Sequence, residues 1–267
     1  MREAATAIKL EASQGHIDLS QIPLSAFPNV LLEYDSISWL ALDGAQFSDG
    51  DIRQISKMNA LTWLQIKNAP ELDYAPLSAL EHLTTLRMTG QVSDISFLRE
   101  LNQLQDLQLG ATRVVDISTV SELTDLRGLL LNFTDVVDLS PIQNLTNLEY
   151  LSIAHTKIND ISAVSGLEVL QNFAAWESQV ADASPLAGLP KLEFVDLRQT
   201  PLASVSGLGD LPRLRILNIS HTQVKSVKDV VRSSNLSVLD VSGVVLDDES
   251  ELAPLIALGV RVILYSD

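Results

Sequence analysis

Pairs of apolar residues separated by one position recur along the chain at almost constant intervals. The first members of successive pairs stand at positions 40, 64, 86, 107, 129, 151, 173, 195, 217, 239 and 262. Each pair predicts a short strand with one buried face, and eleven such rungs indicate a repeat array. The pairs are Leu40/Leu42, Leu64/Ile66, Leu86/Met88, Leu107/Leu109, Leu129/Leu131, Leu151/Ile153, Phe173/Ala175, Val195/Leu197, Leu217/Ile219, Leu239/Val241 and Val262/Leu264.

The segment that follows each pair has a different period. In the unit from Leu145 to Leu167, the apolar residues after the strand fall at spacings of three, as at Ile158, Ile161 and Val164. That spacing favours tight turns or 3₁₀ helix, which has three residues per turn. Twenty-two residues also leave little chain for a long helix, so we expect one true α-helix only in the longer step around residues 49–57.

The repeat unit resembles a known family. Leu123, Leu126, Leu129 and Leu131, with Asp138 following, match the pattern LxxLxxLxLxxNxIxDIxPLxxL. This pattern is typical of the 22-residue leucine-rich repeat of bacterial internalins, and the resemblance covers about residues 37 to 265. It implies an α/β solenoid, a right-handed superhelix with a parallel concave β-sheet of about eleven strands and a mostly 3₁₀ or irregular convex side. It implies an architecture and not a particular partner.

One position of the family pattern is changed. Where the family has Asn, this chain has a hydroxyl residue in six consecutive rungs. A hydroxyl can also bond the local backbone, although it offers fewer donors than an amide. We therefore expect a weaker side-chain ladder in the middle of the array. The six residues are Thr112, Thr134, Thr156, Ser178, Thr200 and Thr222.

The repeats also suggest where the array begins and ends. Residues 1–36 do not follow the period, and we interpret them as an N-terminal cap with a helix-forming stretch at residues 3–12. Residues 37–267 are interpreted as the array, closed by a short helix from Asp247 to Leu258 and a last strand. Acidic residues favour the positive end of that helix. The whole is expected to form one continuous structural domain.

A column of aspartates, one in each of six rungs, invites a calcium-binding interpretation. Calcium requires six to eight oxygens converging on one point, whereas this column spreads carboxylates along a line. Aspartate at turns bonds nearby backbone donors, so we predict turn capping and no metal. The residues are Asp73, Asp94, Asp116, Asp138, Asp160 and Asp182.

The composition limits the classes of partner that we expect for this chain. Lys and Arg number 18 against 34 Asp and Glu, a net charge of −16. Nucleic acid requires a basic face, and anionic membranes repel an acidic chain, so we expect neither as a partner. There is no cysteine, and the first residues lack the apolar region of a secretory signal. We expect a soluble monomer, with the cytoplasm favoured over secretion and no segment inserted in a membrane.

Candidate catalytic chemistry is missing from the pattern. The four histidines, His16, His82, His155 and His221, fall in different rungs. We find no nucleophile–base pair, no phosphate-binding glycine loop and no cluster of metal ligands. The sequence therefore predicts a protein without enzymatic activity, metal or cofactor.

Residues that flank the buried pairs should point out of the concave face. All three tryptophans occupy such positions: Trp39 beside Trp63, and Trp176 between Tyr150 and Phe194 on neighbouring rungs. Because Trp, Tyr and Arg most often anchor protein interfaces, we predict a partner-binding surface there. Its residues are Tyr150, Trp176, Phe194, Arg198, Trp39, Trp63 and Arg87.

Two functions remain open for this surface. The first is a non-enzymatic scaffold that binds a protein with a basic surface, either as an intracellular regulator or as an exported adhesin or effector of the internalin type. The second is a glycan-binding module, in which exposed aromatic rings stack on sugar rings and neighbouring amides bond their hydroxyls. Trp63 with Gln65 and Trp176 with Asn172 fit this pattern. Trp39 and Trp63 also have a purely structural interpretation, in which they pack beneath the N-terminal cap.

Overall fold

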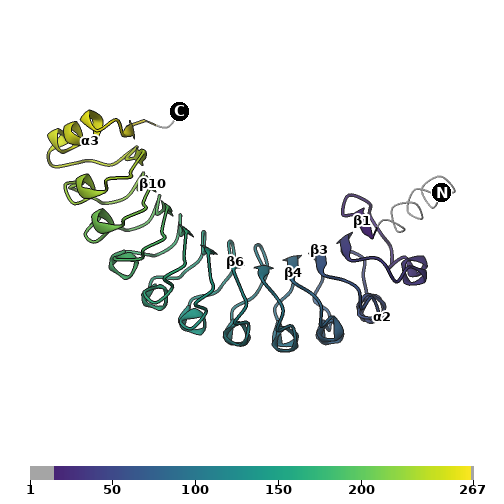
Figure 1. The fold of residues 1–267 in the computed structure, drawn as a ribbon. Coiled ribbons are helices and arrows are strands. Elements are labelled where there is room, and N and C mark those ends of the chain that lie inside the picture. Colours follow the sequence, from purple (N-terminus) through teal and green to yellow (C-terminus); the bar gives the residue numbers. More distant parts are fainter. Residues whose placement is uncertain (1–14, 266–267) are drawn as a thin grey trace. The chain divides into compact units, whose positions relative to one another are not determined.

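The computed structural model describes residues 15–265. The chain forms two compact units, the first ending at Leu126 and the second beginning at Arg127. In each unit, every rung places a short strand on one side and a turn or short helix on the other (Figure 1). We refer to the outward surface of the strands in each unit as its strand face.

The strands of the first unit are parallel, and each pairs with the strand that precedes it along the chain. The register aligns equivalent rung positions, as in Trp39 opposite Trp63 and Leu40 opposite Leu64. The predicted columns are therefore confirmed in this unit. The strands are β1 (His16–Leu19), β2 (Trp39–Asp43), β3 (Trp63–Ala69), β4 (Thr85–Gly90) and β5 (Asp106–Gln108).

The second unit repeats the same parallel arrangement with the same register. Tyr150 lies opposite Asn172, and Asn172 lies opposite Phe194. Its strands are β6 (Gly128–Leu130), β7 (Tyr150–Ser152), β8 (Asn172–Ala174), β9 (Phe194–Asp196), β10 (Ile216–Asn218), β11 (Val238–Asp240) and β12 (Arg261–Ile263).

Short helices return the chain from one strand to the next. The α-helix expected in the long step is α2 (Asp49–Ile55), and the expected closing helix is η10 (Glu249–Leu252) followed by α3 (Ala253–Ala257). The other connections are 3₁₀ helices, as the spacing of three predicts: η1 (Asn29–Glu33), η2 (Ala75–Ala79), η3 (Ser96–Glu100), η4 (Ser118–Glu122), η5 (Ser140–Ile142), η6 (Ser162–Val164), η7 (Ser184–Leu186), η8 (Leu208–Asp210) and η9 (Val230–Arg232). Within residues 15–265, no helix combines the length and the apolar character needed to cross a bilayer.

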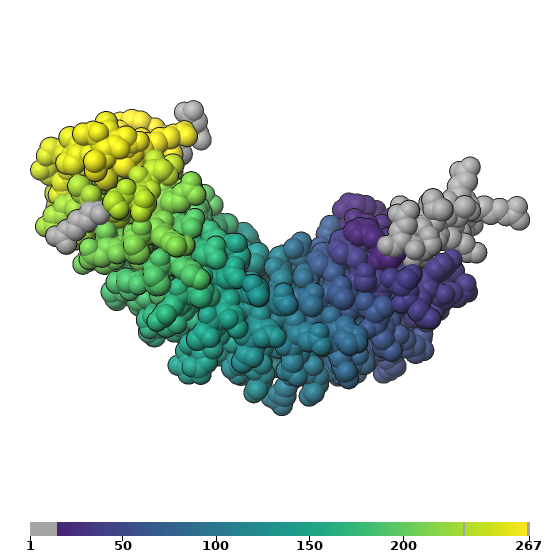
Figure 2. All heavy atoms as spheres, in the orientation of Figure 1, coloured from purple at the N-terminus to yellow at the C-terminus, as the bar shows by residue number. Residues whose placement is uncertain are grey.

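The core of each unit is the stacked set of apolar pairs. From Leu40/Leu42 to Leu239/Val241 these side chains are almost fully buried. In the space-filling view, the atoms of successive rungs lie against one another along each unit (Figure 2). The last pair differs, because Leu264 is 46% exposed beside the edge strand β12.

The structure adds a strand that the repeat pattern did not predict. Strand β1 lies in the segment interpreted as a cap, yet it pairs with β2 in rung register. Ile17 and Leu19 are buried, and they precede Leu40 and Leu42 by one repeat length. The described chain therefore has twelve strands rather than about eleven. The helix-forming stretch at residues 3–12 lies outside the described residues.

The side chains of the hydroxyl column and of the aspartate column form hydrogen bonds with backbone groups of their own rung. The hydroxyl of Thr156 donates to the carbonyl of Ile153 at 2.7 Å, and four other threonines of the column make the same bond three residues back. The carboxylate of Asp160 accepts the backbone N–H of Ser162 at 2.8 Å, and the other five aspartates accept equivalent bonds. Turn capping by the aspartate column is confirmed.

Candidate functional site

A stack of four side chains crosses the strand face of the first unit. The ring of Trp39 lies 3.7 Å from that of His16 and 4.0 Å from that of Trp63, with interplanar angles of 12° and 11°. The guanidinium carbon of Arg87 lies 5.3 Å from the centroid of Trp63. Parallel strands are about 4.8 Å apart, which places rings of one column at stacking distance. We call His16, Trp39, Trp63 and Arg87 the tryptophan stack.

The tryptophan stack leaves little ring face open. Strand β2 lies between β1 and β3, so His16 and Trp63 cover opposite faces of Trp39. Trp63 lies between Trp39 and the cation of Arg87. Both tryptophans are half-buried. Because His16 belongs to the segment interpreted as a cap, the contact supports a structural role for Trp39 beside any role in binding.

A second cluster surrounds Trp176 in the second unit. Trp176 meets the rings of Phe133 and His155 edge to face, with centroid distances of 5.6 and 5.7 Å. Phe133 and His155 stack on each other at 4.5 Å. The guanidinium carbon of Arg198 lies 4.9 Å from the centroid of Trp176. We call Phe133, His155, Trp176 and Arg198 the Trp176 cluster.

Carboxylates hold the two basic members of this cluster. Nε2 of His155 lies 2.6 Å from Oε2 of Glu177. Nε of Arg198 lies 3.6 Å from Oδ2 of Asp196, and the backbone N–H of Arg198 donates to Oδ1 of the same carboxylate at 3.2 Å. Burial raises the pKa of Asp196, while its contacts with Arg198 act in the opposite direction. These contacts orient the side chains of His155 and Arg198 against the aromatic rings.

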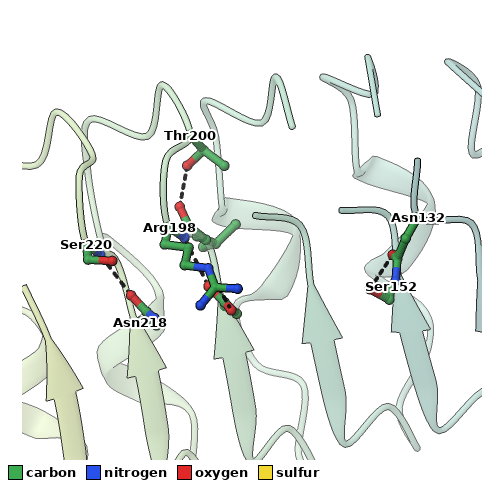
Figure 3. A network of polar contacts seen from close by, with 8 residues as sticks. Asn132, Ser152, Arg198, Thr200, Asn218 and Ser220 are labelled. Atoms are coloured by element: carbon green, nitrogen blue, oxygen red, sulfur yellow. Dashed lines mark hydrogen bonds and ion pairs between the residues drawn. The ribbon is translucent and has the colours of Figure 1, made fainter. Parts of the chain in front are cut away.

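The polar side chains beside the cluster bond within the strand face (Figure 3). Oδ1 of Asn132 accepts the hydroxyl of Ser152 at 2.6 Å and the backbone N–H of Ala154 at 3.0 Å. Oδ1 of Asn218 accepts the backbone N–H of Ser220 at 3.0 Å. These bonds hold the side chains of Asn132 and Asn218 against the backbone of the strand face.

Phe133 and His155 belong to a row of residues in the left-handed backbone conformation. In the second unit this left-handed row consists of Phe133, His155, Glu177, Gln199 and His221, with φ between 55° and 59°. The conformation follows from the turn after each strand, where the N–H of the residue bonds the next rung. The N–H of Phe133 donates to Ala154, and that of His155 to Trp176, at 3.0 and 2.9 Å.

The predicted residues of the second unit fall at two ends of the strands. Tyr150, which is 45% exposed, and Phe194 begin β7 and β9, in one column with Ile216 and Val238. Trp176 follows the end of β8, about 13 Å further along the strand direction at roughly 3.3 Å per residue. The structure thus brings Trp176 and Arg198 together and places Tyr150 and Phe194 at the opposite side of the strand face.

The remaining surface offers weaker candidates. A cavity of about 520 Å³ opens on the helix side of the first unit, with Leu31, Ile37 and Met58 in its lining and Asp35 and Lys57 among its polar groups. It does not include any residue of the tryptophan stack. Among the described residues, no three His, Cys, Asp or Glu side chains are grouped so that they could hold a metal ion.

Comparison with known proteins places this architecture among leucine-rich-repeat proteins. An internalin (inlF) from Listeria monocytogenes superposes with a TM-score of 0.81 at 23% identity, over 91% of this chain and 71% of its own. Internalin C2 from the same organism gives 0.62 at 28% identity, over 74% and 83%. A leucine-rich-repeat protein of Leptospira interrogans gives 0.77 at 20% identity, over 92% and 71%.

These likenesses confirm the fold that the repeat pattern predicted, a leucine-rich-repeat solenoid with parallel strands and 3₁₀ connections. The same fold occurs in the plant peptide hormone receptor RGFR1, whose structure was solved in complex with RGF2 and which gives a TM-score of 0.71 at 14% identity, over 90% of this chain and 45% of the receptor chain. No family model and no curated protein matches the sequence.

Proposed function

We propose that this chain is a non-enzymatic, monomeric scaffold that binds a protein partner on the strand face of its second unit, with the Trp176 cluster as the principal contact. The observation that carries the proposal is the setting of Trp176. Its ring is half-exposed in the middle of a repeat array, yet contacts from Phe133, His155 and Arg198 hold it in place.

Fixed aromatic side chains are favourable for binding. A ring that is already ordered loses little conformational entropy when a partner covers it, and Trp, Tyr and Arg are enriched among the residues that dominate interface energies. In the cluster, Arg198 is ordered by the carboxylate of Asp196 and His155 by Glu177. The cluster therefore has the rigidity and the residue types of an interface anchor.

The charge of the chain suggests the kind of partner. A net charge of −16 should attract a basic protein surface and repel an acidic one. Long-range attraction of this kind raises the association rate more than the final affinity. The plant receptor RGFR1 with RGF2 illustrates that this fold can hold a peptide hormone, although that protein shares only the fold with this chain.

The glycan-binding alternative is less well supported. Sugar rings stack on an open aromatic face, whereas both faces of Trp39 are covered by neighbouring rings. Trp63 lies between Trp39 and Arg87, and Arg198 lies over Trp176. We therefore favour a protein partner, and a glycan array probed with the full chain would test the choice.

Two cellular roles fit this proposal: an intracellular regulator, and an exported adhesin or effector of the internalin type. The structural neighbours include internalins and plant receptors, and a shared fold does not fix location or partner.

The proposal is tested by parallel affinity capture with three forms of the chain: wild type, Trp176→Ala and Gln143→Ala. Gln143 is exposed beside the 3₁₀ helix η5, on the side of the rung opposite the strand. We expect a protein retained by wild type and Gln143→Ala and depleted on Trp176→Ala. With that protein purified, Trp176→Ala should weaken binding about 30-fold or more, corresponding to roughly 2 kcal/mol.

The opposite pattern would overturn the proposal. If Gln143→Ala abolishes binding and Trp176→Ala has no effect, the partner binds the helix side. Circular dichroism of each variant should match wild type, because neither side chain belongs to the buried pairs of the core.

A further inference from the structure

We propose that the left-handed row of the second unit forms a second wall of the partner-binding surface, and that it receives a protein segment carrying lysine or arginine next to an apolar residue. This inference rests on the proposed function and adds to it the contact residues and the chemistry of the partner segment. It is carried by three observations: backbone conformation, exposure and local charge pairing.

The backbone conformation of the row is costly for its residues. Positive φ values suit glycine and, less well, asparagine, because other side chains meet steric strain there. Phe133, His155 and Glu177 nevertheless adopt φ values of 59°, 57° and 56°. Residues kept in such conformations cluster at functional sites, so an observed row of them points to a use for the side chains.

The turn itself does not require large side chains. Equivalent positions in the first unit hold Asn68, Gly90 and Ala111, and the rung after His221 holds Gly243. The same left-handed turn is therefore made with small residues elsewhere in the chain. The large residues are confined to the five rungs that surround Trp176.

The row also contributes little to the core. Phe133 is 50% exposed, and His155, Gln199 and His221 are exposed as well. Phe133 and His155 instead contact each other and the ring of Trp176. Phe133, His155 and Glu177 of the row thus form one surface with Trp176 and Arg198, which extends from the strand face to the turns at the ends of the strands.

Local charges favour a cationic segment in the partner. Two cations along this edge are each beside a carboxylate, Arg198 with Asp196 and Lys157 with Asp135 at 3.0 Å, and the imidazole of His155 lies beside Glu177. They therefore present little uncompensated positive charge, while the chain as a whole is strongly acidic. An exposed ring such as Phe133 binds a lysine or arginine through its negative face, and the adjoining rings bind an apolar neighbour.

The experiment uses the full chain and three hexapeptides as probes: alternating Lys and Leu, alternating Lys and Ser, and alternating Glu and Leu. Binding is measured by isothermal titration calorimetry for wild type, Phe133→Asn, Trp176→Ala and Val137→Asn. Asparagine suits a left-handed turn, so Phe133→Asn keeps the backbone. Val137 is the matched control, because it is 51% exposed in the same rung and lies outside the row.

We expect the Lys–Leu probe to bind at least tenfold more tightly than either other probe. Phe133→Asn should weaken it at least fivefold, and Val137→Asn should change it less than twofold. The melting temperature of Phe133→Asn should equal or exceed that of wild type, because strain is relieved.

Each other outcome is decisive. Loss of affinity in Trp176→Ala but not in Phe133→Asn would show that the row is not part of the binding surface, and it would still support the proposed function. Equal binding in all four forms of the chain would contradict both proposals. Preference for the Glu–Leu probe, no binding of the Lys–Leu probe at millimolar concentration, or a clear fall in the melting temperature of Phe133→Asn would overturn the inference.

Discussion

Two contacts join Asp196, the last residue of β9, to Arg198, which lies two residues later. One carboxylate oxygen accepts the backbone N–H of Arg198 at 3.2 Å, and the other lies 3.6 Å from its Nε. The same guanidinium covers Trp176. A buried carboxylate thus positions a cation that in turn positions an aromatic ring.

Replacing Asp196 with Asn should stabilise the fold near pH 7. Burial raises the pKa of Asp196 above its ordinary value of 3.8, so the folded state binds the proton more tightly than the unfolded state does, and stability falls as the pH rises through the raised pKa. Asparagine keeps an acceptor for the N–H of Arg198 and removes the buried charge. The melting temperature of Asp196→Asn should exceed that of wild type at pH 7 and approach it near pH 4.

Asp210→Asn is the matched control, because Asp210 is exposed. A lower melting temperature of Asp196→Asn at pH 7 would show that the ion pair with Arg198 outweighs the cost of burying the charge.

Asp160 should make the stability of the fold depend on pH in the opposite sense, with stability lost in acid. The backbone N–H and then the hydroxyl of Ser162 lower the pKa of Asp160 from 3.8. The stability that this group contributes is present above about pH 3.8 and is lost as the pH falls through the lowered pKa. In urea titrations between pH 5 and 2.5, Asp160→Asn should lose less stability than wild type. Identical pH dependence would mean that the turn bond does not require the charge.

The buried pairs should dominate stability. Leu151 is 2% exposed, and Leu151→Ala should cost about 2–5 kcal/mol, because it leaves a cavity between rungs. Ser152→Ala removes only the bond to Asn132 and should cost about 1 kcal/mol. Chemical denaturation of both variants measures the difference. Equal costs would contradict the rung register.

The threonine column should contribute through its hydroxyls. Thr156→Val keeps the shape of the side chain and removes the donor to the carbonyl of Ile153. A buried carbonyl left without its partner should cost about 1–3 kcal/mol. Thr146→Val, at an exposed position of the same repeat, should change stability by less than about 0.5 kcal/mol. Comparable losses of stability in the two variants would show that the buried hydroxyls of the column do not stabilise the turn.

The parts of the fold that follow from periodicity could be predicted from the sequence. The nearly constant spacing of the apolar pairs determines the strand register from Trp39 to Arg261, because burial on one side of a strand has a strict period of two. Strand β1 escaped prediction, although Ile17 and Leu19 repeat the apolar pair. They stand one repeat length before the next pair, but the segment between the two pairs, which contains Pro23 and Pro28, does not follow the rest of the repeat pattern.

The Trp176 cluster could be predicted only in part. Trp176 and Arg198 follow from the outward columns, whereas Phe133 and His155 do not, because the alternation of a strand ends before the left-handed turn. A signal was present at the same register. Asn68, Gly90 and Gly243 are residue types that favour positive φ, and they mark the turn conformation that the intervening rungs share.

The hydroxyl and carboxylate bonds described for the turns join residues two or three positions apart. Both partners of each bond therefore lie in the same 22-residue segment, and the bond does not depend on which rung precedes or follows that segment. A gene that duplicates or loses one such segment preserves every bond of this kind and alters only the junction between neighbours. The length of the array can consequently change by whole 22-residue segments, whereas an insertion of two or three residues within one segment would disrupt both its turn and its strand register.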